Sequence, residues 1–323
     1  MAVGTFLREK VLATEEHPLD KGRRRGLGLL LRGMCMGTAD VIPGVSGGTV
    51  ALIMGIYDEL VGTIASIDGR ALQALLRGRV IEVLRLVNAG FIVPILAGII
   101  LSIATFAKLI TYLLAMYPQP LWGFFTGLIL ASALYVARQI ERGYGIKLPL
   151  FIAFGTAFGY GITVLVPVET GTESYKFILA GLVAICAMIL PGISGSFLLV
   201  IMGKYQQVFS AVHERDWQVI ALFGLGAVTG ILIFSRFLKR LLARYYSATM
   251  AFLVGLMLGS LRKVWPFRNV LEERVVGSKT LVLRDECIWP SEFDGEVWLS
   301  FALMGVGAVS VLVLEQIGQR DRA

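Results

Sequence analysis

Long apolar segments separated by short polar loops make up most of this 323-residue chain. Segments of this kind are long enough to cross or enter the hydrocarbon core of a bilayer as helices. Ten are predicted, at about 26–42, 44–66, 89–116, 120–137, 148–166, 175–190, 192–212, 217–243, 247–265 and 297–316. The pattern therefore predicts an all-α polytopic membrane protein.

The second five segments repeat the first five. The stretch "IPGVSGGTVALIMGIY" at 42–57 returns as "LPGISGSFLLVIMGKY" at 190–205, at a constant offset of 148 residues. Further along, an offset of 128 pairs Lys108 with Arg236. In each half the interrupted segment pair contributes two membrane crossings or none, and the remaining segments contribute three. The total is odd in both cases, so the second half enters the membrane from the side opposite to the first. The chain is therefore interpreted as two inverted repeats.

A Pro-Gly dipeptide interrupts the first apolar pair of each half, at Pro43 and again at Pro191. Each pair is interpreted as a broken-helix, re-entrant hairpin followed by three transmembrane helices, because segment 26–42 is only 17 residues long and contains Arg32. Two full spans are the alternative. The predicted organisation is a cytoplasmic tail at 1–25, a first repeat at 26–166, a second, inverted repeat at 174–316 that includes an external loop at 266–296, and a cytoplasmic C-terminus at 317–323.

Composition agrees with this class, since 56% of residues are hydrophobic, 16% are charged and the mean hydropathy is +0.75. The net charge of +7 does not indicate nucleic-acid binding, because Lys and Arg cluster in short loops without interleaved aromatic residues. Those loops share one side of the membrane if both termini are cytoplasmic. We expect a multi-pass protein of the cell (inner) membrane. The three cysteines lack metal-ligand spacing, so neither metal nor cofactor is expected.

The interrupted motifs favour an anion site. Proline and glycine end one helix at mid-membrane, and the next helix begins there with unpaired N–H groups and the positive end of its dipole. Hydroxyls can cap that helix, and glycines let a phosphate approach the backbone. The alternative is that the motifs only pack helices together. The candidate substrate-binding residues on the motifs are Gly44, Ser46, Gly47, Gly48, Thr49, Gly192, Ser194, Gly195 and Ser196.

Ionisable residues inside apolar segments are further candidates, because charge is costly there. Lys108 and Arg236 are expected on opposite halves of the membrane, where each would meet the substrate, and Arg32 joins them as a substrate-binding candidate. Snorkelling to the interface is the alternative for the two matched cations. Asp40 either carries a coupling ion, a proton or sodium, or pairs with Arg32, and both interpretations stay open.

A serine hydrolase is the enzymatic alternative, because "GVSG" and "GISG" match the pattern around the nucleophile of rhomboid intramembrane proteases. That chemistry needs a base within hydrogen-bond reach. The histidines are His17, in the polar tail, and His213, at the end of segment 192–212, and neither can serve both serines. No catalytic residue is therefore assigned, and the protein is not expected to be an enzyme. A carrier of small soluble anions would use the same motifs and stays an alternative.

The motif stretches "MGTADVIPGVSGGTVALIMGIYDELV" at 36–61 and "LPGISGSFLLVIMGKY" at 190–205 resemble the polyprenyl-phosphate (undecaprenyl phosphate) transporter family PopT. The likeness covers roughly residues 26–265 and does not extend to 266–296. It implies a flippase that returns undecaprenyl phosphate, the lipid carrier of cell-wall glycans, from the outer to the cytoplasmic leaflet. The motif residues named above would hold the phosphate. Ser196 stands where the first motif has Gly48, so the two sites need not be equivalent.

Overall fold

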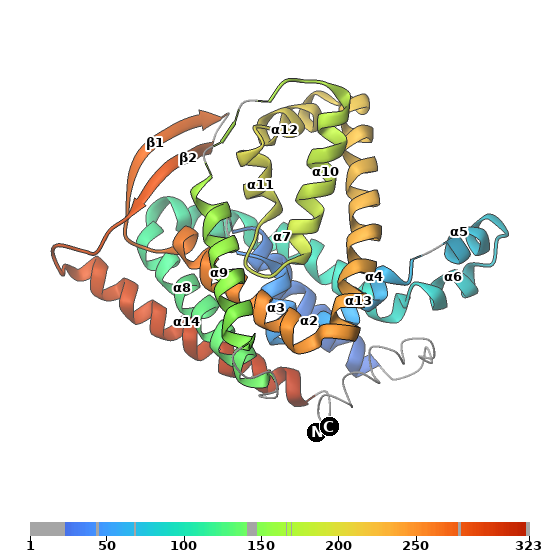
Figure 1. Ribbon diagram of the computed structural model, residues 1–323, viewed down its shortest axis with the longest axis horizontal. Coiled ribbons are helices and arrows are strands. Elements are labelled where there is room, and N and C mark those ends of the chain that lie inside the picture. The colour runs from blue at the N-terminus through green and yellow to red at the C-terminus, as the bar shows by residue number, and fades with distance from the viewer. Residues whose placement is uncertain are drawn as a thin grey trace.

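The computed structural model describes residues 23–42, 45–67, 69–140, 147–165, 167–168, 170–276 and 279–320, and helices dominate it (Figure 1). Within these residues, five helices are long and apolar enough to cross a bilayer. They are α7 (Ala89–Met116), α8 (Pro118–Gln139), α9 (Lys147–Val164), α13 (Trp217–Val264) and α14 (Gly295–Arg320). The all-α polytopic class predicted from the sequence is therefore confirmed.

Helix α13 contains two of the predicted segments. It has 48 residues and is interrupted at Tyr245, whose backbone is non-helical with φ −132° and ψ 46°. At ~1.5 Å per residue its length is roughly 70 Å, more than twice the hydrocarbon thickness of about 30 Å. The break falls between segments 217–243 and 247–265, and the ribbon changes direction sharply along α13 (Figure 1). Two predicted spans are thus joined at a kink.

The first interrupted pair forms α2 (Arg23–Asp40), α3 (Gly47–Ile53) and α4 (Tyr57–Ala65). Helix α3 has only 7 residues, about 10 Å of helix, and α4 departs from it at 119°. Predicted segment 44–66 is therefore two short helices and not a continuous one. Pro43 and Gly44 lie outside the described residues.

The second interrupted pair forms α10 (Ser174–Ile189), α11 (Gly195–Ile201) and α12 (Tyr205–Glu214). The chain before α10 bonds to the end of α11: Val168 N–H donates to the Ile201 carbonyl over 2.9 Å, and the Thr170 hydroxyl donates to the Met202 carbonyl over 2.6 Å. The hairpin thus begins and ends on one side of the molecule, where α10 and α11 lie side by side (Figure 1). This geometry fits a re-entrant hairpin, and the 7-residue α11 is too short to span.

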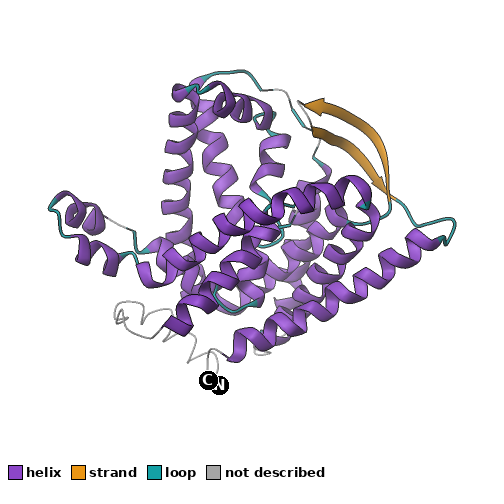
Figure 2. Ribbon diagram, turned by 180° about the vertical axis from the view of Figure 1, so that it is seen from behind, coloured by secondary structure: helices purple, strands orange, loops and turns teal. Residues whose placement is uncertain are grey.

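Two features were not predicted from the sequence. Short helices α5 (Gly69–Leu76) and α6 (Val80–Leu86) project from the body, and strands β1 (Arg268–Val276) and β2 (Lys279–Cys287) pair antiparallel (Figure 2). The expected loop 266–296 is therefore largely a β ribbon. Aromatic contacts of Trp265 and Phe267, which precede β1, and of Trp289, which follows β2, join the base of the ribbon to Phe301 of α14.

The largest buried cluster surrounds the two interrupted pairs. Val45 and Ala51 of the first pair are fully buried, as are Leu256 and Met257 in the second limb of α13. Polar side chains share this interior, among them Ser46 and Thr49 at 1% and 0% exposure. Buried hydroxyls need hydrogen-bond partners, which the contact between the two motifs supplies.

Candidate functional site

The two Pro-Gly motifs meet at the buried centre of the molecule. Gly192 N–H donates to the Thr49 hydroxyl over 3.0 Å. In the reverse direction, the Ser46 hydroxyl donates to the Leu190 carbonyl over 3.2 Å, and the Tyr57 hydroxyl donates to the Ile189 carbonyl over 3.1 Å. Side chains of the first interrupted pair therefore bond to the backbone of the second, and residues that the sequence singled out in separate halves meet in one polar junction.

The start of α3 already holds a carboxylate. Ser46 is the N-cap, and its side chain accepts from Gly48 N–H over 3.1 Å, as the sequence suggested. Gly47 N–H donates to Asp40 Oδ1 over 2.7 Å. A Cβ on Gly47 would lie 2.6 Å from the other Asp40 oxygen, so only glycine admits this contact. Asp40 thus neutralises the positive end of α3, a position that neither sequence interpretation of it foresaw.

The second motif differs from the first. Ser194 occupies the N-cap position of α11 but makes no side-chain cap bond; its hydroxyl bonds instead to that of Ser196 over 2.8 Å. Gly192 has φ +87°, a left-handed conformation that side-chain-bearing residues rarely adopt. A Cβ on Gly195 would lie 2.5 Å from the Ala184 carbonyl oxygen, so this glycine also serves close packing. The two motifs are therefore not equivalent, in agreement with the Ser196-for-Gly48 difference.

The predicted intramembrane cations lie outside this junction. Arg236 donates to the carbonyls of Leu232, over 3.2 Å, and Ile67, over 2.5 Å, and so ties α13 to the residues that follow α4. Lys108 is exposed on α7, and Arg32 is buried within α2 at 8% exposure. The structure thus brings Ser46, Thr49 and Asp40 of the first motif to the backbone around Gly192, with Ser194 and Ser196 paired just beyond it, but it does not bring Lys108 or Arg236 to them.

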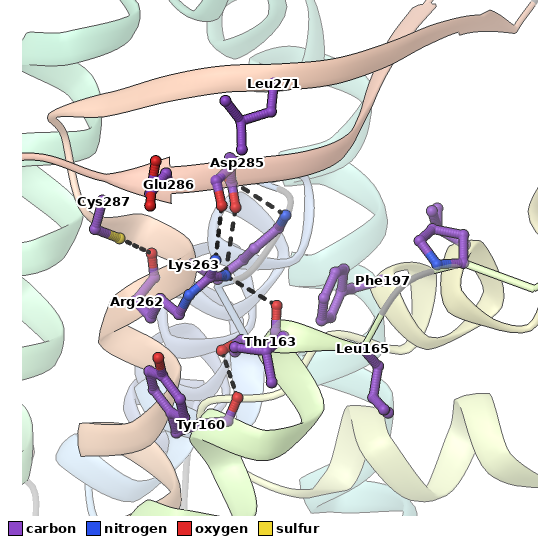
Figure 3. Close-up of a pocket in the computed structure, with 13 residues that line it drawn as sticks. Tyr160, Thr163, Leu165, Phe197, Arg262, Lys263, Leu271, Asp285, Glu286 and Cys287 are labelled. Carbon is purple, nitrogen blue, oxygen red and sulfur yellow. Dashed lines mark hydrogen bonds and ion pairs between the residues drawn. The ribbon is translucent and has the colours of Figure 1, made fainter.

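A basic cluster that sequence reasoning missed lies beneath the β ribbon (Figure 3). Arg262 and Lys263 lie in the last turn of α13, Arg268 is the first residue of β1, and Asp285 lies near the end of β2. The Asp285 carboxylate lies 3.3 Å from Arg262 Nη1, 3.6 Å from Lys263 Nζ and 3.1 Å from Arg268 Nη1. These side chains line or flank a pocket of about 620 Å³. The sequence did contain one indication of this cluster. Arg262 and Lys263 are expected on the external side of the membrane, whereas basic residues tend to lie on the cytoplasmic side.

The part of the chain that the structure describes holds no side-chain cluster suited to a metal ion. No group of three or more His, Cys, Asp or Glu side chains converges there. The three cysteines, Cys35, Cys186 and Cys287, are free thiols.

Helices long enough to span a bilayer, arranged around a buried junction of two interrupted pairs, define a polytopic membrane protein with a polar centre. A comparison with protein families sharpens this class. The model of the undecaprenyl phosphate translocase-like family matches residues 36–281, and the chain belongs to this family.

Two curated relatives span most of the chain. A polyprenyl-phosphate transporter of Vibrio cholerae serotype O1 is 42% identical over 301 residues, which cover 91% of this chain and 97% of the relative. A polyprenyl-phosphate transporter of Staphylococcus aureus is 32% identical over 254 residues, covering 73% of this chain and 85% of the relative. No solved structure shows a significant match.

Proposed function

We propose that this protein is a flippase that returns a polyprenyl phosphate from the outer to the cytoplasmic leaflet of the cell membrane. The observation that carries the proposal is the polar junction, in which Gly192 N–H bonds to Thr49 and the Ser46 hydroxyl bonds to the Leu190 carbonyl. The names of the two relatives supply the substrate class. A headgroup crossing the bilayer needs such polar groups at mid-membrane, whereas the isoprenoid tail stays in lipid throughout.

In this proposal the phosphate is held at the two motifs, and the inverted repeats give access from each leaflet in turn. The Ser194 and Ser196 hydroxyls exchange their mutual hydrogen bond for phosphate oxygens. At the start of α3, Gly47 N–H already donates a hydrogen bond to the Asp40 carboxylate. The phosphate and this carboxylate therefore compete for the same positive helix end. Protonation of Asp40 would weaken its hold on Gly47 and admit the phosphate. This sequence of events couples a proton to substrate binding.

The proposed orientation has both termini in the cytoplasm and the β ribbon outside. The basic residues of the short loops then lie on the cytoplasmic side. The motif serines act as hydrogen-bond donors and not as nucleophiles, since Ser46 bonds to backbone carbonyls and Ser194 bonds to Ser196. His213, the histidine that the sequence offered as a base, is exposed at the end of α12.

Reconstitution into liposomes of defined orientation tests the proposal. A fluorescent undecaprenyl phosphate is followed leaflet by leaflet, beside undecaprenol and labelled inorganic phosphate in separate samples. We expect movement of the phosphorylated lipid alone. The double variant S46A/S194A should slow it, whereas T105V, which removes a hydroxyl bonded only within α7, should not. Uptake of inorganic phosphate without lipid movement would establish the soluble-anion carrier instead, and a covalent adduct of a serine-directed inhibitor would establish a hydrolase.

A further inference from the structure

The cluster around Asp285, beneath the β ribbon, holds more positive than negative charge, although only Arg262, Lys263, Asp285 and Glu286 of the charged residues line the pocket and Arg268 flanks it. Arg262, Lys263 and Arg268 surround the single buried carboxylate of Asp285, whose side chain is 4% exposed. Glu286 also lines the pocket, but it is exposed at the rim. Three partly buried cations against one buried carboxylate favour an additional or more highly charged anion, since charge that is shielded from water is costly without a partner.

The cations are fixed in place by contacts other than Asp285. Arg262 donates to the Thr163 carbonyl over 3.0 Å. Lys263 Nζ lies 4.9 Å from the ring centroid of Phe197 in α11, and Arg268 lies over Trp122 of α8 at 4.8 Å. Side chains held in this way keep their positions when the carboxylate leaves, so the pocket is prepared for another anion.

The pocket also adjoins the second motif. Thr163, Phe197 and Lys263 line it, and the same three residues line a smaller cavity with Gly192, Ser194 and Ser260. Lys263 therefore stands between the space under the ribbon and the Ser194 hydroxyl. An anion released from Arg262 and Lys263 would next meet the second motif.

We propose that this pocket is the docking site for a phosphomonoester headgroup on the ribbon side of the molecule, and that Asp285 is an internal substitute that the headgroup displaces. A phosphomonoester carries about −1.5 to −2 charge at pH 7 and three acceptor oxygens, so it neutralises three cations better than one carboxylate does. Strand β2 carries Asp285 and Cys287, so displacement moves this edge of the ribbon off the pocket. The identity of the ligand as a lipid rests on the proposed function; the anion site itself rests on the cluster.

Binding of farnesyl phosphate in detergent tests the site, with farnesol and inorganic phosphate as separate probes. Lys263→Gln should weaken farnesyl phosphate binding by about tenfold, as expected for loss of one charge-assisted contact. Asp285→Asn should strengthen it by roughly three- to tenfold, because the internal competitor is neutralised. Lys176→Gln is the matched control, since Lys176 is paired with Glu173 and does not line the pocket.

Cys287 supplies a second readout, because it lines the same pocket. Farnesyl phosphate should slow its reaction with a maleimide in the wild type and in K176Q, and K263Q should need about tenfold more of the ligand for the same protection. Thermal unfolding of each variant, measured without ligand, separates lost binding from lost structure. A purely structural Asp285 would make D285N less stable and no better at binding, and that result would overturn the inference.

The outcomes also separate this inference from the proposed function. If the wild type moves undecaprenyl phosphate while K263Q and D285N bind farnesyl phosphate as the wild type does, the docking site is wrong and the transport proposal stands. If inorganic phosphate protects Cys287 at the same concentration as farnesyl phosphate, the site does not select a lipid and that part of the inference fails. If the wild type neither binds farnesyl phosphate nor moves the lipid, both proposals fail.

Discussion

The backbone N–H of Gly192 donates a hydrogen bond of 3.0 Å to the hydroxyl of Thr49, 143 residues earlier in the chain. Both groups are buried, and each belongs to a different Pro-Gly motif. Non-helical backbone inside a membrane must find its hydrogen-bond partners within the protein. The Thr49 hydroxyl supplies such a partner for the Gly192 N–H, which the break between α10 and α11 leaves without a helical acceptor. The two halves of the chain thus depend on one another at their least regular points.

Thr49→Val should destabilise the protein, because Gly192 N–H then loses its acceptor inside a closed core. An unsatisfied buried donor costs about 1–3 kcal/mol. Thr49→Ser keeps the hydroxyl and should lose far less. Thermal or denaturant unfolding in detergent measures the difference, with T105V as the control for removal of a hydroxyl bonded within its own helix. Equal stability of T49V and T49S would show that the bond is dispensable.

The two motif serines should respond differently to alanine. Ser46 caps α3 and also bonds to the other pair, so Ser46→Ala should lower stability by about 1 kcal/mol or more. Ser194 makes no cap bond, so Ser194→Ala should change stability less. If its hydroxyl holds phosphate, S194A should still weaken polyprenyl-phosphate binding by about 1 kcal/mol. Unfolding and binding measured on the same preparations decide this, and unchanged binding by S194A would remove Ser194 from the site.

Gly192→Ala should be strongly destabilising for backbone reasons. At φ +87° a side chain is strained by about 1–3 kcal/mol, and its Cβ would also lie 2.9 Å from the Cα of Met257. Gly224 offers the matched control, because it lies within α13 and a Cβ there would meet nothing within 4 Å. Gly224→Ala should raise stability by roughly 0.5–1 kcal/mol. If G224A also lost folded protein, the effect of G192A could not be assigned to the backbone conformation of Gly192.

Hydropathy was sufficient to predict the long helices, because their boundaries are local. Helix α7 ends at Met116, where the apolar run meets "YPQP", and the break in α13 at Tyr245 follows a basic cluster at 239–244. The duplicated motif likewise identified the serines and glycines of the junction.

The ribbon and its pocket could not be predicted in the same way. Residues 268–287 mix charges with apolar residues and have no repeat counterpart, so periodicity gave no clear strand pattern. Asp285 reaches Arg262 only because β1 and β2 pair with Arg268 opposite Cys287. Such a contact depends on strand register, which the hydropathy profile does not specify.

Cys287 should react with an impermeant maleimide from outside intact cells, since the β ribbon is proposed to be external. Burial raises the pKa of the Cys287 thiol above its ordinary value, with a smaller rise from Asp285 and opposing contributions from nearby cations such as Arg262. The thiolate is the reactive form, so labelling should be slow at neutral pH and keep rising above about pH 9, where an ordinary thiol levels off. Purified protein gives the pH profile, with a small free thiol as reference. Labelling in cells only after the inner membrane is opened would reverse the orientation.

Lys108 and Arg236 should affect different steps of transport if the two halves are inverted repeats as proposed, because inversion would place these equivalent positions on opposite halves of the membrane. With inward flux, Lys108→Gln should impair capture from the outer leaflet, since the first intramembrane cation is lost. Arg236→Gln should spare capture and slow delivery to the cytoplasmic leaflet.

The bonds of Arg236 to Ile67 and Leu232 require a structural control, because their loss could slow transport by loosening α4. Arg236→Lys keeps the charge but loses the forked donors, so normal delivery by R236K and slow delivery by R236Q would assign the effect to charge. Leaflet-resolved transport of a fluorescent polyprenyl phosphate in oriented vesicles, with binding measured in detergent, separates the steps. Lys108 is exposed on α7, as a snorkelling side chain would be. If K108Q and R236Q both bind and transport as the wild type does, the two cations only snorkel and the division of steps is wrong.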